Sequence, residues 1–263
     1  MFILAADIAL RGGIFVVVLL ALLLLEAVIG GPNPPAMRGR RWPANFGLIL
    51  VGTLLVRLVL PVGVVGVAAW AQARGIGLLN QFDLPAWLAL TVALVLLDLA
   101  IYWQHRLLHA WPLLWRLHRA HHLDVTLDAT SALRFHPLEL LMSLGFKVVL
   151  VVALGVTPLA AMVFEVLLSS FALVTHANLA LPTWLDRPLR ALVVTPNMHR
   201  IHHSTQGDEQ RRNFGFNLSV WDHLFGSYAA QAREQPQDFG VAGVEGRDAT
   251  DFLALLREPF VRR

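Results

Sequence analysis

Long apolar segments separated by shorter polar ones occupy the first two thirds of the chain. The longest are residues 12–29, with the sequence "GGIFVVVLLALLLLEAVI", and residues 46–70 and 85–104. Each is close to, or longer than, the roughly 20 apolar residues with which a helix crosses the hydrocarbon core of a bilayer. The pattern therefore predicts three membrane-spanning helices.

Residues 137–177 contain two shorter apolar segments divided by "GVTP" at residues 155–158. This pattern predicts a tight helical hairpin that either crosses the membrane or re-enters it. Lys147 and Glu165 lie about equally far from the turn, so an antiparallel hairpin sets them side by side as an ion pair. The alternative is that Lys147 extends to the membrane interface. The fold class is thus all-α, a multi-pass helical membrane protein with about four membrane-embedded helices or helical hairpins.

Polar segments separate and follow these spans. "GGPNPPAMRGRRWP" at residues 30–43 predicts a basic loop rich in Pro and Gly. After Asn178 the chain is polar, apart from an amphipathic stretch, "ATDFLALLREPF", near its end. We divide the chain into N-terminal membrane helices (1–97), a histidine-rich domain (98–230) that includes the hairpin 137–177, and a cytosolic C-terminal tail (231–263).

Composition supports a membrane protein and excludes several other classes. Of 263 residues, 56% are hydrophobic and 15% are charged, which is too apolar for an ordinary soluble domain. Cysteine is absent, so disulfides, iron–sulfur clusters and cysteine-held zinc are excluded. The net charge of +3 does not indicate nucleic-acid binding, because the arginines are scattered and no aromatic–basic RNA motif accompanies them. Asp7 and Arg11 ahead of a long first apolar run favour an anchored helix over a signal peptide.

The distribution of Lys and Arg predicts the orientation. With the N-terminus outside, the segments on the inner side hold 17 of the 21 Lys and Arg residues, as the positive-inside rule requires. This orientation places every histidine motif at the cytoplasmic boundary of the membrane. We expect a multi-pass protein of a bacterial inner membrane with its site on the cytoplasmic side.

Histidine is concentrated in three five-residue windows, "HRLLH", "HRAHH" and "HRIHH". Histidines at i and i+4 of a helix share a face and can chelate one metal ion. The histidine at i+3 points at a different angle, which suits a second ion beside the first. Neutral imidazole suits iron, zinc and copper. The windows hold eight of the eleven histidines and predict a two-metal centre with four or five nitrogens for each ion: His105, His109, His118, His121, His122, His199, His202 and His203.

The three remaining histidines and several carboxylates are further candidates. His176 in "THAN" and His136 in "RFHPLE" fall at helix ends facing the windows, so each is an additional ligand or a neighbour of the ligands, His176 being the stronger candidate. His223 is expected to be structural. Asp98 and Tyr102 continue the helical stripe of the first window, and Asp98 either accepts a hydrogen bond from a ligating imidazole or lines a hydrated cavity. Weaker candidates for supporting hydrogen bonds are Glu139, Asp124 and Asp222.

On these residues the sequence resembles the fatty acid hydroxylase and sterol desaturase superfamily of integral membrane di-iron oxygenases. The matching motifs run from residue 98 to 228: "DLAIYWQHRLLH", "LWRLHRAHH", "SALRFHPLE", "THANL", "TPNMHRIHHS" and "NFGFNLSVWDHLFGSY". The resemblance implies a cytosolic helical cap that carries the two-metal site, with the eight histidines above, His176 and His136 as ligands. Beside these ligands, Asp98, Tyr102 and Asn178 are the candidates for catalytic roles. Ser227 stands where the superfamily pattern ends in Thr.

The resemblance further implies two Fe ions, with zinc as a substitute in isolated protein, O2 as co-substrate and hydroxylation of a lipid C–H bond. Desaturation by the same type of site is the alternative. The sequence has no GxGxxG motif and no cysteine, so electrons are expected from a separate ferredoxin or cytochrome-type donor. An acidic donor, or anionic lipid headgroups, would bind the arginines expected on the cytosolic side: Arg116, Arg119, Arg200, Arg211 and Arg212.

Three other classes of protein fit the sequence less well. A zinc peptidase is disfavoured because there is no HExxH motif. A bis-histidine haem protein would place paired histidines on facing helices within the bilayer, unlike the triplets at helix ends. A non-catalytic metal-binding or transport protein would usually carry ionisable groups along a path across the membrane, whereas here the histidines lie on one side.

Overall fold

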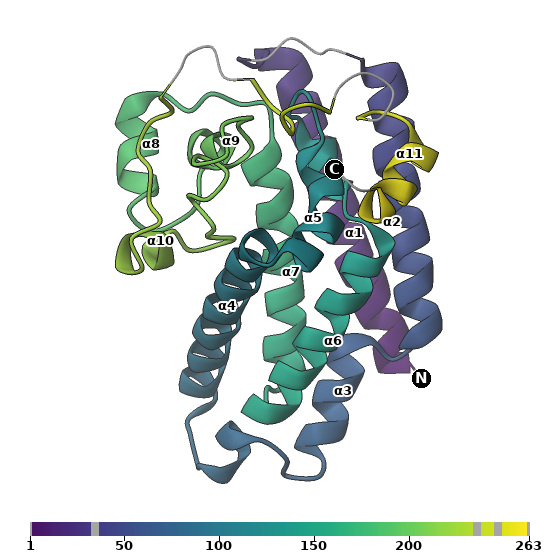
Figure 1. The fold of residues 1–263 in the computed structure, drawn as a ribbon. Coiled ribbons are helices and arrows are strands. Elements are labelled where there is room, and N and C mark those ends of the chain that lie inside the picture. Colours follow the sequence, from purple (N-terminus) through teal and green to yellow (C-terminus); the bar gives the residue numbers. More distant parts are fainter. Residues whose placement is uncertain (1, 33–36, 234–237, 245–248, 262–263) are drawn as a thin grey trace.

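Long apolar helices form a bundle that ends in a cap of short helices (Figure 1). The structure is a computed structural model that describes residues 2–32, 37–233, 238–244 and 249–261, with side chains from residue 9. The described residues contain no β-strand, only two isolated bridges. Five candidate spans are long and apolar enough to cross a membrane, which confirms an all-α, multi-pass architecture: Ala9–Ile29, Arg38–Gln72, Ala86–Ala110, Pro137–Leu154 and Pro158–His176.

The first three spans differ in detail from the sequence prediction. The first lies in α1 (Phe2–Ile29), and the third is α4 (Ala86–Ala110), which continues past residue 104 and carries the "HRLLH" window. The second is not one helix but two, α2 (Arg38–Val59) and α3 (Gly63–Gln72). The break lies at Pro61, because the residue before a proline is pushed out of the helical region: Leu60 has φ −136° and ψ 80°.

The predicted hairpin is present as α6 (Pro137–Leu154) and α7 (Pro158–His176). Gly155 ends α6 in the left-handed region, at φ 70°, and the Thr157 side chain caps α7 by accepting from the backbone N–H of Ala160. The predicted ion pair is confirmed, since Lys147 Nζ lies 2.6 Å from Glu165 Oε1.

Short helices cover one end of the bundle, and we call this region the cap. It starts with α5 (Pro112–His122) and the 3₁₀ turn η2 (Ala129–Leu133) and continues after α7. The later helices are α8 (Thr183–Leu189), α9 (Pro196–His202), α10 (Val220–Leu224), α11 (Phe252–Arg257) and the turn η3 (Glu258–Phe260). A 3₁₀ turn, η1 (Leu78–Gln81), lies at the opposite end, between α3 and α4.

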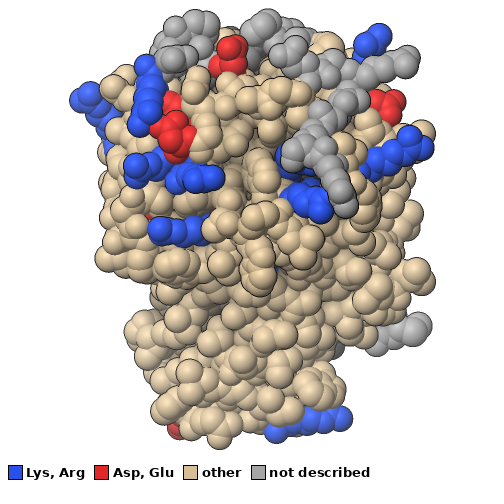
Figure 2. Space-filling view, viewed as in Figure 1, with Lys and Arg blue, Asp and Glu red and all other residues tan. Residues whose placement is uncertain are grey.

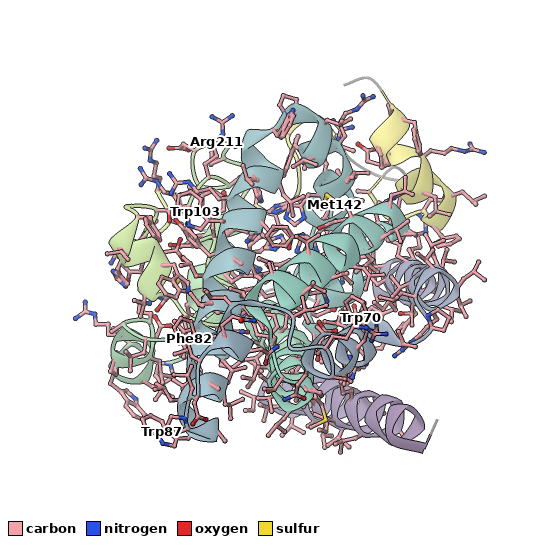
Figure 3. The ribbon with its side chains drawn as sticks, turned by 90° about the horizontal axis from the view of Figure 1, so that it is seen from below. Trp70, Phe82, Trp87, Trp103, Met142 and Arg211 are labelled. Atoms are coloured by element: carbon pink, nitrogen blue, oxygen red, sulfur yellow. The ribbon has the colours of Figure 1, made fainter. Side chains whose placement is uncertain are left out.

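Charge and tryptophan mark the band that the bilayer would surround. In Figure 2 the Lys and Arg side chains gather over the cap, whereas the surface of the lower bundle is almost uncharged apart from its tip. Figure 3, seen from below, has Trp87 at the rim of the bundle; it is 67% exposed. Trp111, 61% exposed, lies 24 positions further along the chain, about 36 Å at the helical rise. Exposed tryptophans at this spacing suit the two interfaces of a bilayer with a hydrocarbon core of about 30 Å.

A buried charge network fixes α2 to the cap. Arg41 Nε donates to Asp124 Oδ1 at 2.5 Å, and its Nη1 donates to Asp128 Oδ2 at 2.9 Å, with Arg41 and Asp124 fully buried. The prediction of a loop over residues 30–43 is wrong for residues 38–43, which form the first turns of α2. Residues 33–36 of the predicted loop lie outside the described residues. The amphipathic stretch noted near the end of the chain contains α11, which packs on α2.

Candidate metal centre

Nine histidines converge into two compact groups where the bundle meets the cap. Within each group the candidate ligand atoms all lie within 4.8 Å of one another. We call them the five-histidine group (His105, His109, His118, His122 and His202) and the four-histidine group (His121, His176, His199 and His203). The two groups adjoin each other, because the rings of His122 and His203 are stacked with centroids 4.3 Å apart.

The two HxxHH windows divide their side chains between the groups in a crosswise manner. On α5, His118 and His122, four residues apart, enter the five-histidine group, and His121 enters the other. On α9, His199 and His203 enter the four-histidine group, and His202 enters the other. This is the arrangement expected from helix geometry, in which the i and i+4 side chains share a face and the i+3 side chain is offset.

Backbone and carboxylate acceptors orient the five-histidine group. Nδ1 of His105 donates to the carbonyl of Phe214 and Nδ1 of His202 to that of Arg212, both at 2.8 Å. Glu139 Oε1 accepts from Nδ1 of His118 at 2.7 Å. A carbonyl can only accept, so the protons of neutral His105 and His202 lie on Nδ1 and their Nε2 atoms carry lone pairs.

Several nitrogens of this group have no protein partner in the part of the chain that the structure describes. The Nε2 atoms of His105, His109, His118 and His202 are buried and have no hydrogen-bond partner among the described residues. Buried polar atoms are almost always paired, so several unpaired nitrogens within 4.8 Å of one another fit a bound cation.

The four-histidine group contains contacts that hydrogen bonds alone do not explain. Nε2 of His176 lies 3.1 Å from Nε2 of His121, 3.1 Å from that of His203 and 3.2 Å from that of His199. Nδ1 of His176 donates to the carbonyl of Ala172 at 2.7 Å, which leaves a lone pair on its Nε2. Two nitrogens each about 2.1 Å from one cation are separated by about 3.0 to 3.4 Å, so these distances suit a shared metal ion.

Burial keeps the imidazoles neutral, which is the form that binds metal. Burial lowers the pKa of His202 to about 3. It also lowers the pKa values of His121, His122, His199 and His203 well below their ordinary value, with neighbouring rings adding to the effect. Since cationic imidazolium has no free lone pair, these nitrogens are prepared as ligands near neutral pH.

His136 and His223 lie outside both groups. Nδ1 of His136 accepts from the backbone N–H of Leu138, so the ring caps α6, and Nε2 donates to the carbonyl of Leu256. With both nitrogens engaged, His136 is not positioned as the additional ligand that was predicted. His223 donates to the carbonyl of Arg190 and packs on Tyr228.

Asp98 and Tyr102 hold the cap rather than the imidazoles. Oδ2 of Asp98 accepts from Trp221 Nε1 at 2.8 Å and from the backbone N–H of Leu218 at 3.2 Å. The Tyr102 hydroxyl is 2.8 Å from Ser227 Oγ and accepts from Arg106. The acceptor of the His105 Nδ1 proton is Phe214, not Asp98, so the proposed contact between Asp98 and an imidazole is wrong for that ring.

Asn178 lies at the junction of α1 and the cap. Its backbone N–H donates to Glu26 Oε1 at 2.9 Å, and the same oxygen accepts from the backbone N–H of Ala129 at 2.8 Å. Glu26 is 4% exposed and was missed by the sequence analysis, although a single carboxylate in an apolar span was its signal.

Asp222 positions one of the carbonyls that orient the histidines. Its carboxylate accepts from the backbone N–H groups of Phe214 and Gly215, each at 2.8 Å, and from Ser227 Oγ at 2.6 Å. Both Asp222 and Glu139 therefore make hydrogen bonds that support the histidines, as was considered from the sequence. Glu139 bonds directly to His118, whereas Asp222 holds the backbone segment whose Phe214 carbonyl accepts from His105. The carbonyls of Phe214 and Arg212 left no signal in the sequence, because every residue carries the same group.

A largely apolar cavity of about 380 Å³ runs from the five-histidine group into the bundle. His105 and His118 lie in its wall at one end, and its sides include Ile101, Leu144 and Phe216. An apolar chain in this cavity would reach the imidazoles without entering water.

Two of the arginines proposed for donor docking are used inside the protein. Arg119 Nε lies 2.7 Å from Glu258 Oε1, and Arg200 donates to the carbonyls of Ala177 and Leu179; both side chains are buried. Arg211 and Arg212 are exposed, and Arg116 is half-buried.

Comparison with known proteins gives a consistent set of relatives. The family model for fatty acid hydroxylase matches residues 90–227, just over half of the chain. An ornithine lipid hydroxylase of Rhizobium tropici is 33% identical over 180 residues, which cover 68% of this chain and 52% of that protein. The alkylglycerol monooxygenase of Homo sapiens is 28% identical, covering 51% of this chain and 29% of that protein. A sphinganine C4-monooxygenase of Arabidopsis thaliana is 29% identical, covering 61% and 60%. The chain therefore spans about half the length of the first of these relatives, and no solved structure matches.

Proposed function

The chain belongs to the fatty acid hydroxylase family, and from this premise we propose that it is a membrane-bound oxygenase that hydroxylates a C–H bond of a lipid. The reaction inserts one atom of O2 into the bond and reduces the other to water with two electrons and two protons from outside. Its relatives are named as hydroxylases and monooxygenases of lipids. The single observation that carries the proposal is the pair of histidine groups at the end of an apolar cavity.

The nine histidines would hold two iron ions, one in each group. When bound and reduced, the iron pair supplies the oxygen activation that an unactivated C–H bond requires. Residues of this chain would present and orient the ligands. His105 and His118 lie in the cavity wall. Glu139 holds the His118 ring, and the carbonyls of Phe214 and Arg212 fix the tautomers of His105 and His202. Apolar walls exclude water and align the lipid chain with the imidazoles.

Electrons would reach the site through the exposed side of the cap. The Arg212 carbonyl that accepts from His202 Nδ1 belongs to a segment in which Arg211 and Arg212 face outward. Two adjacent guanidinium groups this close to a ligand suit an acidic donor of the ferredoxin or cytochrome type. With the positive side of the protein in the cytoplasm, the metal centre lies on the cytoplasmic side of a bacterial inner membrane.

The proposal is tested by comparing lipids from cells with and without the gene under ¹⁸O2. A lipid that gains one labelled oxygen identifies the substrate and the reaction together, whereas an unlabelled lipid that loses two hydrogens indicates desaturation. His202→Ala should abolish the product while the protein remains in the membrane, and His223→Ala, at a histidine outside both groups, should retain it. A product that persists in His202→Ala would contradict the proposal.

A further inference from the structure

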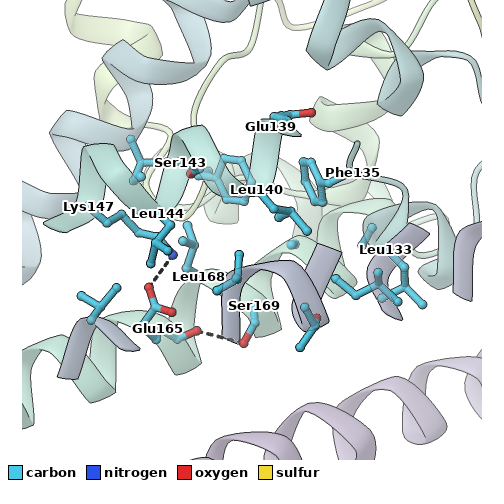
Figure 4. Close-up of a pocket in the computed structure, with 18 of the residues that line it drawn as sticks. Leu133, Phe135, Glu139, Leu140, Ser143, Leu144, Lys147, Glu165, Leu168 and Ser169 are labelled. Atoms are coloured by element: carbon cyan, nitrogen blue, oxygen red, sulfur yellow. Dashed lines mark hydrogen bonds and ion pairs between the residues drawn. The ribbon is translucent and has the colours of Figure 1, made fainter. Parts of the chain in front are cut away.

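Four charged side chains lie in the cavity wall away from the imidazoles, at membrane depth. Arg11 comes from α1, Arg57 from α2, Lys147 from α6 and Glu165 from α7, and we call this end of the cavity the cationic pocket. Figure 4 shows Lys147 paired with Glu165, apart from Glu139. Charges within the membrane are costly and commonly belong to a binding site or a pathway.

The pocket holds more positive than negative charge. Glu165 is the partner of two cations, with Oε1 2.6 Å from Lys147 Nζ and Oε2 3.2 Å from Arg11 Nη1. Arg57 Nη1 donates to the carbonyl of Pro61 at 3.4 Å. Among the described residues, Arg57 makes no ion pair with Glu165. The only other carboxylate in the described cavity wall, Glu139, is bonded to His118. The four charged residues of this pocket therefore comprise three cations and one carboxylate. Such an excess in an apolar layer favours the binding of an anion.

The backbone adds to this preference. The α3 helix begins at Gly63, which lines the cavity. A Cβ atom on Gly63 would lie 3.4 Å from Arg57 Nη1 and 4.0 Å from Arg11 Nη2, so both guanidinium groups converge on the N-terminus of this helix. A helix N-terminus carries partial positive charge and stabilises anions.

We propose that the cationic pocket binds the anionic head group, a phosphate or a carboxylate, of the lipid substrate. The chain of that lipid then extends along the apolar cavity to His105 and His118. This inference rests on the proposed function, because it concerns the substrate of the same site.

The pocket would set which carbon is hydroxylated. Glu139, bonded to His118, and Lys147 are eight positions apart on α6, which is about 12 Å along the helix. A zigzag chain of about nine or ten carbon atoms covers this distance, since each carbon–carbon bond of about 1.5 Å advances the chain by somewhat less. Hydroxylation at a fixed distance from the anionic group is the consequence.

The affinity of the purified protein for lipid probes tests whether the cationic pocket binds an anionic head group, without any need for turnover. The probes are hexadecanoate, hexadecyl phosphate and the uncharged hexadecanol. The native protein should bind the anionic probes at least about tenfold more tightly than the alcohol, as expected for a charge-assisted contact. Arg57→Gln removes one cation of the pocket and leaves both ion pairs of Glu165 intact, so this variant should lose most of the preference for anionic probes. Arg57→Lys keeps the charge and should keep most of the preference. The matched control Arg74→Gln, at an arginine packed on the exposed Trp70 ring, should leave it unchanged. If Arg57→Gln does not fold, Arg57→Met carries the same expectation.

Equal affinity for acid and alcohol, or an undiminished preference in Arg57→Gln, would overturn the proposal. Displacement of hexadecyl phosphate by inorganic phosphate at similar concentrations would also overturn it, since the site would then take free anions. A lower affinity in Arg57→Gln with an unchanged position of hydroxylation would assign the pocket to a bystander lipid and overturn the substrate assignment. A charge preference without any labelled product would instead contradict the proposed function alone.

Discussion

The two histidine groups are built from the same residue type but lie in different surroundings. The five-histidine group is contributed by α4, α5 and α9, and two of its rings line the cavity. The four-histidine group is contributed by α5, α7 and α9 or the residue that ends it, and none of its rings is in the cavity wall described. Under the proposed function, the five-histidine group would therefore face the substrate, and the four-histidine group would complete the centre from the side away from the cavity.

The groups also differ in how their rings are held. Three rings of the five-histidine group donate to fixed acceptors through Nδ1, two to backbone carbonyls and one to Glu139. In the four-histidine group His176 does so, while Nδ1 of His121, His199 and His203 has no partner among the described residues. The first group is oriented by the cap, and the second depends more on packing and on the ion that its nitrogens would share.

The largest effect is expected from removing one ligand in either group. His118→Ala and His199→Ala should each lower the metal content from two ions per chain to about one and cut hydroxylation at least about a hundredfold, because both ions are needed for oxygen activation. Elemental analysis and product formation measure the two quantities. A variant of the four-histidine group that keeps full activity with one ion would show that this group is not part of the centre.

A smaller effect, and a sharper comparison, comes from the hydrogen bonds behind the rings. Glu139→Gln keeps an acceptor for His118 Nδ1 but removes its charge, and should lower metal affinity or activity about 10- to 100-fold. The counterpart beside the four-histidine group is Thr175→Val, which loses a bond to the carbonyl of Ala172 and should change either quantity less than about threefold. Chelator competition and initial rates measure both. Equal losses of metal affinity or activity in Glu139→Gln and Thr175→Val would contradict the proposed difference in how the two groups hold their rings.

The smallest effect is expected at Tyr102, whose hydroxyl contacts Ser227 and Arg106 rather than a histidine. Tyr102→Phe keeps the aromatic packing and removes these bonds, so it should lower the free energy of unfolding by about 1 kcal/mol. Activity should stay within about threefold of the native value, because the ring does not reach the metal centre. Thermal unfolding in detergent and initial rates test this, and a loss as large as that of His118→Ala would make Tyr102 catalytic.

Much of the fold was predictable because membrane insertion depends on local apolarity. The spans, the hairpin and the Lys147–Glu165 pair follow from runs of apolar residues and from distance to a turn. The break at Pro61 was missed because a long apolar run outweighed one proline. The capping role of His136 was not predicted although "HP" carries a local signal, a polar residue followed by proline at the start of a helix.

The sequence by itself determined the number of apolar spans and which histidines share a helix face, since both depend on residues a few positions apart. Only the tertiary structure decided how nine of those histidines divide into a group of five and a group of four, and that His176 joins them. It also decided that Glu26, Asp222 and two backbone carbonyls hold the site. The contacts of Glu26 with Ala129 and of His105 with Phe214 join residues more than 100 positions apart, and those of Asp222 and His202 cross loops without a regular repeat. Their partners are fixed by packing, which leaves no periodic trace in the sequence.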